Sequence, residues 1–178
     1  MIRNFIIFVF IIFSTPINSQ EKVADLLKGG NKLIFIRHAY APGNGDPTNF
    51  KLKDCSTQRN LSNKGIIQSK EIGKFFLKNK IQVDKVLSSE WCRCKDTAMF
   101  AFNRYVAFDA LNSFFDPRFE NNKDKQISDL KDYIKNWKSE KNLVLITHYV
   151  VISEILKTGA NSGEIIISDK EFNIIGRY

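Results

Sequence analysis

The sequence LIFIRH at residues 33–38 consists of four apolar residues followed directly by two basic ones. A short apolar run that ends in this way predicts a buried strand that delivers side chains at its end. The stretch LVLITH at residues 143–148 repeats the pattern, and the two stretches hold the only two histidines, His38 and His148. Ligands of α/β sheets bind beyond the carboxyl ends of the strands. Two imidazoles in such places, one of them beside Arg37, point to a site for an anion and for proton or phosphoryl transfer.

Strand and helix patterns alternate along the rest of the chain, which predicts an α/β fold, a three-layer α/β/α sandwich with a mostly parallel sheet. Strands are expected at 32–37, 83–87, 104–108 and 143–147, with a hairpin of 163–168 and 172–175. Helices are expected at 21–28, 66–78, 90–102, 123–137 and 150–156, the last one stopped by Gly159. The helix at 66–78 follows Ser62 as its N-cap, and its spacing predicts a buried face of Ile67, Ile72, Phe75 and Phe76. Residues 111–122 show no clear period and are expected to form a loop.

The first twenty residues have the order of a secretory signal peptide. Arg3 precedes an apolar run of nine residues from Phe5 to Phe13, and the chain turns small and polar by Ser19 and Gln20. The run is shorter than the roughly 20 residues of a membrane span. We therefore expect a signal peptide over residues 1–20, a periplasmic or secreted protein, and no stable membrane insertion after cleavage. An uncleaved N-terminal anchor is the alternative.

Composition indicates an ordinary globular protein. The chain has 178 residues, of which 43% are hydrophobic and 26% charged, so we expect one domain over residues 21–178. The net charge of +8 indicates either a solvated lysine-rich surface or a positive electrostatic field that attracts anionic substrates. The lysines are spread along the chain and no nucleic-acid motif is present, so nucleic acid is not an expected partner. The sequence indicates no oligomeric state.

The chemistry of the first strand end depends on His38. An imidazole can attack phosphorus and form a covalent phosphohistidine, which water later hydrolyses. Such a nucleophile must be neutral and held in one tautomer. Cations must also surround the transferred group, because its equatorial oxygens carry the charge. Arg37 next to His38 fits this requirement.

Four segments in the same order resemble the motifs of the histidine phosphatase superfamily, the phosphoglycerate mutase-like proteins. They are RHA at residues 37–39, LSNKGIIQ at 61–68, SSEWCRCKDTA at 88–98 and TH at 147–148. The resemblance covers residues 32–156. It implies the three-layer fold named above and a phosphatase that works through phosphohistidine, with no metal ion and no cofactor.

The resemblance also implies roles for individual residues. His38 would be the nucleophile, and Arg37 and Arg93 would bind the phosphoryl oxygens with their planar guanidinium groups. His148 would donate a hydrogen bond to the same oxygens. Arg59, in a polar loop, is expected at the rim of the pocket as a substrate-binding residue.

The general acid is where the chain departs from the family. The common Arg-His-Gly-Glu start is replaced by Arg-His-Ala39-Tyr40, and the glutamate that many members carry after the third strand is missing. Asp116 is the best-placed carboxyl for this role. Asp46, in the loop after the nucleophile, is the second candidate and a further candidate for substrate binding. A general acid must carry a proton and meet the leaving oxygen.

Three cysteines remain, and an exported protein with three cysteines is expected to form one disulfide and to keep one thiol. Because both histidines have other uses, CRC at residues 92–94 is not interpreted as a metal motif. Residues 54–62 together with 91–93 resemble an exported subgroup near the periplasmic phosphatase proposed to act on lipopolysaccharide heptose phosphates. In that fold the two segments approach each other, which implies a Cys55–Cys92 bridge that braces Arg93.

These observations favour an exported, metal-independent phosphomonoesterase that acts on a small phosphorylated substrate, such as a phosphorylated sugar or envelope glycan. A non-catalytic phosphosugar- or anion-binding protein of the same fold is the main alternative, because no glutamate acid is evident. A phosphomutase fits export less well. The loops at residues 40–60 and 112–122 are expected to form the rim of the substrate pocket. Their aromatic residues would either stack on a sugar or cover the core; they are Phe50, Phe114, Phe115 and Phe119.

Overall fold

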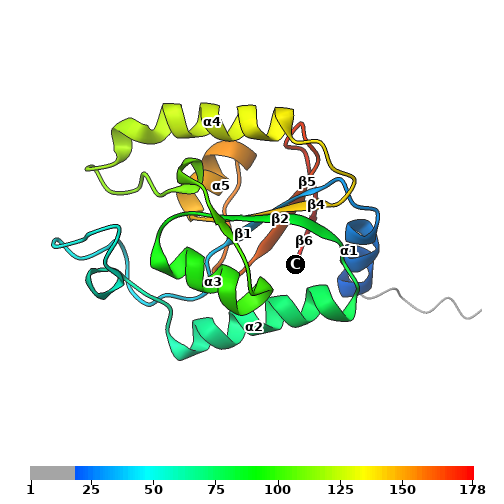
Figure 1. Ribbon diagram of the computed structural model, residues 1–178, viewed down its shortest axis with the longest axis horizontal. Coiled ribbons are helices and arrows are strands. Elements are labelled where there is room, and N and C mark those ends of the chain that lie inside the picture. Colours follow the sequence, from blue (N-terminus) through cyan, green and yellow to red (C-terminus); the bar gives the residue numbers. More distant parts are fainter. Residues whose placement is uncertain (1–18) are drawn as a thin grey trace, which may run out of the picture.

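A computed structural model describes residues 19–178 of the protein, in which five helices and six strands follow one another (Figure 1). The helices are α1 (Ser19–Lys28), α2 (Asn63–Lys78), α3 (Cys92–Phe102), α4 (Lys123–Asn136) and α5 (Tyr149–Leu156). The strands are β1 (Leu33–Arg37), β2 (Val83–Ser88), β3 (Val106–Ala107), β4 (Asn142–Thr147), β5 (Ile165–Ser168) and β6 (Ile174–Arg177).

The six strands form one sheet in the order β3-β2-β4-β1-β5-β6. The first four strands are parallel to one another, while β5 pairs antiparallel with β1 and β6 antiparallel with β5. Strands β1 and β4 are neighbours, and their register sets Arg37 opposite Thr147. The residues that follow, His38 and His148, therefore leave the sheet together at the carboxyl edge.

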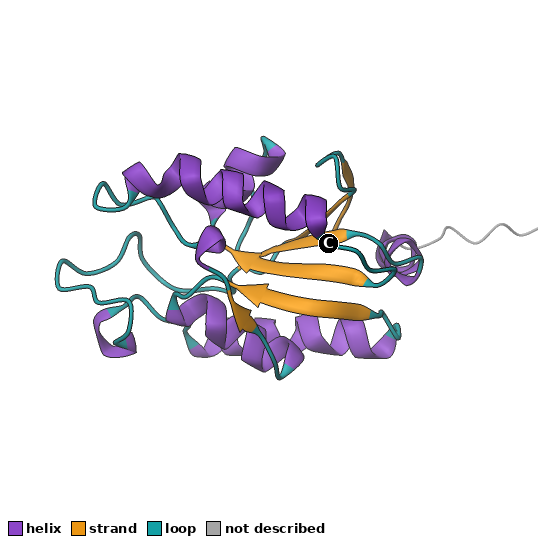
Figure 2. Cartoon of the chain, turned by 45° about the horizontal axis from the view of Figure 1, so that its top comes forward, coloured by secondary structure: helices purple, strands orange, loops and turns teal. Residues whose placement is uncertain are grey.

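Helices cover both faces of this sheet (Figures 1 and 2). In β1, Leu33 and Phe35 join a core cluster with α4 and α5, while Ile34 and Ile36 join a second cluster with α1, α2 and α3. These four side chains are fully buried, as expected for a central parallel strand covered on both faces. The predicted α/β sandwich with a mostly parallel sheet is thus confirmed.

The predicted buried face of α2 is wrong at one position, because Ile67 is 61% exposed. The helix begins at Asn63 after Ser62, whose hydroxyl accepts a hydrogen bond from the backbone N–H of Gly65. Gly65 lies against the backbone of Tyr40, where an added Cβ would meet the carbonyl oxygen at 2.2 Å. The buried stripe therefore runs through Gly65, Ser69 and Ile72 at helical spacing, which turns Ile67 outward.

Near the C-terminus, one stop signal and one strand position differ from the prediction. Helix α5 ends at Leu156 as predicted, but it is Lys157, with a left-handed φ of 52°, that ends it and not Gly159. The second strand of the terminal hairpin lies later than predicted, at Ile174–Arg177, and the predicted loop at 111–122 contains the short 3₁₀ turn Glu120–Asn122.

The predicted signal peptide lies outside the described residues, apart from Ser19 and Gln20 at the start of α1. Among the residues from 19 onward, no helix has the length and apolar character needed to cross a membrane.

Candidate active site

The ends of β1 and β4 place two imidazole rings beside each other. The backbone N–H of His38 donates to the carbonyl of Thr147 over 2.9 Å, and the ring centroids of His38 and His148 are 5.4 Å apart. The two residues are only 2% and 4% exposed. Both line one cavity of about 170 Å³ at the carboxyl edge of the sheet, where an α/β fold binds its ligands.

The ring of His38 is held in the tautomer that a nucleophile needs. Its Nδ1 lies 2.9 Å from the carbonyl oxygen of Ala39. A carbonyl can only accept, so Nδ1 carries the hydrogen and Nε2 keeps its lone pair. Burial, and then the positive charge of Arg93, lower the pKa of His38 from 6.5 to about 3, despite the hydrogen bond to Ala39. The ring is therefore neutral across the physiological pH range.

Three arginines surround the rings and line the same cavity. Arg37 ends β1, Arg93 lies in the first turn of α3, and Arg59 comes from the loop before α2. Burial and the charge of Arg93 lower the pKa of Arg37, and the same two causes lower that of Arg59 to about 10. Burial is the larger cause of both shifts, and the smaller one, the crowding of like charges, is a repulsion that a bound anion would relieve.

Arg93 is held by a carboxylate. Its Nη1 and Nη2 donate to Asp46 Oδ1 and Oδ2 over 2.8 and 3.2 Å, and its side chain is 3% exposed. Asp46 also accepts hydrogen bonds from the indole of Trp91 and the backbone N–H of Arg59. Burial alone would raise the pKa of Asp46, but the hydrogen bonds and charge of Arg93 lower it overall. Asp46 is thus an ionised residue that positions Arg93, and it holds no proton for a leaving group.

Two buried guanidinium nitrogens have no hydrogen-bond partner among the described residues, Nε of Arg37 and Nε of Arg93. Leaving a buried donor unpaired is costly, so such atoms mark places where a ligand completes the hydrogen bonding. The Nη1 of Arg37 donates to the carbonyl of Ala160, which anchors the side chain at its other end. The two arginines that carry these unpaired donors line the same cavity as the neutral His38.

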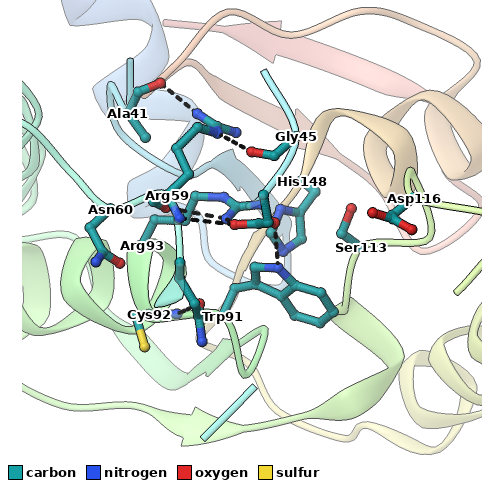
Figure 3. A network of polar contacts seen from close by, with 12 residues as sticks. Ala41, Gly45, Arg59, Asn60, Trp91, Cys92, Arg93, Ser113, Asp116 and His148 are labelled. Carbon is teal, nitrogen blue, oxygen red and sulfur yellow. Dashed lines mark hydrogen bonds and ion pairs between the residues drawn. The ribbon is translucent and has the colours of Figure 1, made fainter. Parts of the chain in front are cut away.

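Arg59 braces the loop that carries Asp46. Its Nε donates to the carbonyl of Gly45 over 2.8 Å and its Nη1 to the carbonyl of Ala41 (Figure 3). The sequence placed Arg59 at the pocket rim, and the structure places it in the cavity lining with these two bonds already made. It therefore contributes positive charge and loop geometry together.

Asp116 lies in the same cavity lining, on the loop before α4, but its carboxylate is paired with Arg118. Arg118 Nη2 and Nε approach the two oxygens of Asp116 at 2.7 and 2.9 Å. The side-chain and backbone hydrogen bonds from Arg118 lower the pKa of Asp116 to about 2. The structure thus brings both candidate acids to the cavity, and both are ionised.

A disulfide joins Cys55 to Cys92, directly before Arg93. The amide of Gln58 adds a second tie, because its Oε1 accepts the backbone N–H of Cys92 over 3.0 Å. The loop before α2 is thereby fastened to the first turn of α3. The remaining thiol, Cys94, is fully buried, and burial raises its pKa to about 12.

Several lining residues were missed at the sequence level. Trp91 and Tyr149 line the cavity, and each is next to a residue that was identified, Cys92 or His148. Outside the lining, Ser89 Oγ lies 2.9 Å from Nε2 of His148, and Asn112 Oδ1 accepts a hydrogen bond from that hydroxyl. Ser89 directly follows the end of β2, so the strand-end rule that selected the histidines could have selected it too.

The structure separates the roles of the rim aromatics. Phe114 is buried in the core, while Phe50 and Phe119 pack with Trp91 at centroid distances of 5.2 and 5.5 Å. Phe115 is 64% exposed and lines the cavity. Of the four phenylalanines, Phe115 is the one with a large exposed surface at the cavity.

No group of three histidine, cysteine, aspartate or glutamate side chains within residues 19–178 is arranged to hold a metal ion. The chemistry available in the described cavity is that of two imidazoles, three guanidinium groups and two paired carboxylates.

Comparisons with protein-family models and with curated proteins found no match. Comparison with solved structures found matches across most of the chain. The protein histidine phosphatase SixA complexed with tungstate aligns with a TM-score of 0.56 and 14% identity, over 83% of this chain and 94% of SixA. The protein TTHB049 from Thermus thermophilus aligns with a TM-score of 0.58 and 15% identity, over 82% and 98% of the two chains.

A phosphoserine phosphatase mutant from Entamoeba histolytica, in complex with phosphoserine, aligns with a TM-score of 0.55 and 18% identity, over 76% of this chain and 89% of that one. Identities this low establish the fold alone. The fold expected from the resemblance is therefore confirmed: the chain has the α/β fold of the histidine phosphatases.

Proposed function

We propose that this protein is a phosphomonoesterase that transfers a phosphoryl group to His38 and then to water, without a metal ion. The observation that carries this proposal is the pair of unpaired buried donors, Arg37 Nε and Arg93 Nε, in one cavity with a neutral His38. The phosphatases among the structural neighbours support the same reaction class.

The first step is attack by His38 Nε2 on phosphorus, opposite the leaving oxygen. The bond between phosphorus and that oxygen breaks, and the phosphoryl group is carried on Nε2 while Nδ1–H stays bonded to the carbonyl of Ala39. The guanidinium groups of Arg37 and Arg93 stabilise the charge on the equatorial oxygens. Asp46 keeps the planar group of Arg93 in place through its paired hydrogen bonds. In the second step water attacks phosphorus and His38 is released with inorganic phosphate.

Export and substrate class are further parts of this proposal. The signal-like residues 1–20 and the Cys55–Cys92 disulfide support a periplasmic or secreted location, since disulfides persist in oxidising compartments. The net charge of +8 favours anionic substrates. Phosphorylated sugars or envelope glycans fit both features, and they also fit the resemblance to the exported heptose-phosphate phosphatase subgroup.

One observation favours a second candidate, a phosphosugar- or anion-binding protein without turnover. Asp46 and Asp116 are both ion-paired and both have lowered pKa values, so neither supplies a proton to a leaving group. Such a protein would keep the arginine pocket and bind phosphate without hydrolysing esters.

Hydrolysis of p-nitrophenyl phosphate distinguishes the two, because its leaving group departs readily without an acid. We expect wild-type protein to hydrolyse it and the His38→Ala variant to lose at least about a thousandfold in kcat/KM, in line with removal of a covalent nucleophile. Equal activity in both proteins would overturn the nucleophile. Phosphate binding without any hydrolysis would favour the binding protein.

A further inference from the structure

One edge of the His148 ring is enclosed by hydrogen-bonding groups. Its Nε2 lies 2.9 Å from Ser89 Oγ and 3.5 Å from Cys94 Sγ. Ser89 is fully buried, and so is Cys94. The hydrogens on these two neighbours decide which nitrogen of His148 is protonated.

The hydrogen of the Ser89 hydroxyl is committed to Asn112. Asn112 Oδ1 accepts the backbone N–H of Glu90 over 2.8 Å, and Asn112 Nδ2 donates to the Glu90 carboxylate over 2.7 Å. A flipped amide would oppose both contacts, so the orientation of Asn112 is determined. Ser89 Oγ lies 3.0 Å from Asn112 Oδ1 and must be the donor there.

Because the Ser89 hydroxyl donates to Asn112, its 2.9 Å contact with His148 Nε2 requires that Nε2 carries a hydrogen and donates it to Ser89. The Cys94 thiol then has no acceptor at Nε2, and its hydrogen points to the carbonyl oxygen of Thr147, 3.7 Å from Sγ. Burial, then the charge of Arg93 and of His38, lower the pKa of His148 well below 6.5, so the ring is neutral and Nδ1 holds a lone pair.

His148 lines the phosphoryl cavity, and its Nδ1 makes no hydrogen bond with any residue in the described range. A neutral ring with hydrogen on Nε2 presents an acceptor to a phosphoryl oxygen. It becomes a donor there only after Nδ1 takes up a proton. The expected role of His148 as a ready-made donor is therefore changed by its surroundings.

We propose that His148 Nδ1 carries the proton that the leaving group receives, so that His148 and not a carboxyl is the general acid. This inference rests on the proposed phosphatase function. The substrate binds with one proton shared between a phosphoryl oxygen and Nδ1. When His38 Nε2 attacks and the phosphorus–oxygen bond breaks, that proton passes to the leaving oxygen, which departs as an alcohol. His148 returns to the neutral form. In the second step it accepts the proton of the attacking water while the bond between phosphorus and His38 Nε2 breaks, and that proton leaves with inorganic phosphate.

Other charged groups around His148 do not compete for this role. Asp46 is ion-paired with Arg93, and Asp116 is ion-paired with Arg118. The Cys94 thiol stays protonated because burial raises its pKa. The remaining charged or titratable groups that line the cavity with His148 are Arg37, His38, Arg59 and Tyr149. Ser89 and Asn112 are positioning residues, because they act through the ring of His148.

The pH dependence of kcat/KM tests the bound proton. Phosphomonoesters lose their second proton near pH 6. In the proposed reaction the ester enters with one proton, as the monoanion. The fraction of monoanion falls tenfold per pH unit above about pH 6, so we expect kcat/KM for phenyl phosphate to fall about tenfold per pH unit there. A value of kcat/KM that stays constant from about pH 6 to pH 9 would overturn the role of His148.

Two variants test the hydrogen-bond chain. Ser89→Ala removes the acceptor of Nε2–H, and Asn112→Ala releases the Ser89 hydroxyl so that it can donate to Nε2. Both changes let the hydrogen move to Nδ1. We therefore expect kcat/KM for phenyl phosphate to decline less steeply at alkaline pH. We also expect the ratio of the rate with phenyl phosphate to the rate with p-nitrophenyl phosphate to fall about tenfold. Ser89→Thr keeps a hydroxyl and should keep the wild-type profile. Ser88→Ala is the matched control, because Ser88 donates to the Ser89 carbonyl and does not contact His148.

The tautomer can also be read without turnover. ¹⁵N NMR of the two imidazole rings in the unliganded protein should show hydrogen on Nε2 of His148 in wild type and Ser88→Ala, and a shift toward Nδ1 in Ser89→Ala and Asn112→Ala. Hydrogen on Nδ1 in the wild-type protein would overturn the inference even if phosphatase activity is present. Absence of turnover with the expected tautomer would instead contradict the proposed function.

Discussion

Asp46 and Arg93 form a bidentate ion pair in the cavity lining, in which both oxygens of the carboxylate accept from the guanidinium group. Their side chains are 11% and 3% exposed. The carboxylate of Asp46 thus fixes the orientation of Arg93, the arginine that is expected to bind the phosphoryl group. Asp46, which the sequence offers as a candidate acid or substrate-binding residue, accepts two hydrogen bonds from Arg93 in the structure.

Replacing the carboxylate tests this relationship. We expect Asp46→Asn to lower the free energy of unfolding by about 3 kcal/mol or more, because it leaves a buried guanidinium without its counter-charge. We also expect kcat/KM to fall by about a hundredfold, the order of loss that follows a misplaced binding group. Asp132→Asn is the matched control, since Asp132 is exposed on α4 and does not line the cavity. Chemical denaturation and p-nitrophenyl phosphate kinetics measure the two effects, and wild-type values for both would show that Arg93 does not need Asp46.

The ion pair between Asp116 and Arg118 predicts that Asp116 is not the proton donor. We expect Asp116→Asn to change kcat/KM by similar factors for phenyl phosphate and for p-nitrophenyl phosphate, whose leaving group is the weaker base. A general acid would show a much larger loss for phenyl phosphate. Such a selective loss, measured in parallel assays with both esters, would restore Asp116 as the acid.

The lowered pKa of His38 predicts how the reaction responds to acid. A nucleophile with its pKa near 3 is neutral at every higher pH, so we expect no loss of kcat/KM between about pH 6.5 and pH 4. An ordinary histidine would instead lose its lone pair as the pH falls through 6.5. A pH titration of kcat/KM, with the fold monitored by circular dichroism, measures this limb, and a decline centred near pH 6.5 would mean that His38 is exposed or differently placed.

The disulfide predicts a stability effect together with an effect on the site. Cys55 and Cys92 close a loop with a sequence separation of 37, for which chain entropy gives about 3–4 kcal/mol of stabilisation. We expect the double change Cys55→Ser, Cys92→Ser to lose about that free energy of unfolding and to raise KM, because the first turn of α3 carries Arg93. Reducing agent should weaken wild type in the same way and leave the double variant unchanged. A double variant as stable as wild type would show that the bridge does not brace the site.

Much of the fold follows from local sequence. The apolar runs that end at Arg37 and Thr147 identify the two central strands, because a parallel strand covered on both faces must be apolar throughout. Their parallel pairing then brings His38 and His148 together without further information. Ile67 was placed on the wrong face because the close approach of Gly65 to Tyr40, which orients α2, is a tertiary contact.

The ion pairs of Asp46 and Asp116 could not be predicted from local sequence in the same way. Asp46 meets Arg93 across 47 residues of sequence, so nothing near either residue indicates that the carboxylate is occupied. Asp116 is paired with Arg118 only two residues away, yet the sequence alone does not show that the loop folds both side chains toward each other. The Ser89 hydroxyl donates to Asn112, which lies on a different loop, so the sequence does not show where the hydrogen of this hydroxyl points.

Phosphorylation of His38 during the reaction can be trapped by rapid quenching. Wild-type protein mixed with p-nitrophenyl phosphate and quenched in alkali within milliseconds should carry one phosphoryl group, stable in alkali and lost in acid, on the peptide that contains His38. The His38→Ala variant should carry none. Turnover of the ester by wild-type protein with no phosphoryl group on His38 at any quench time would contradict the account.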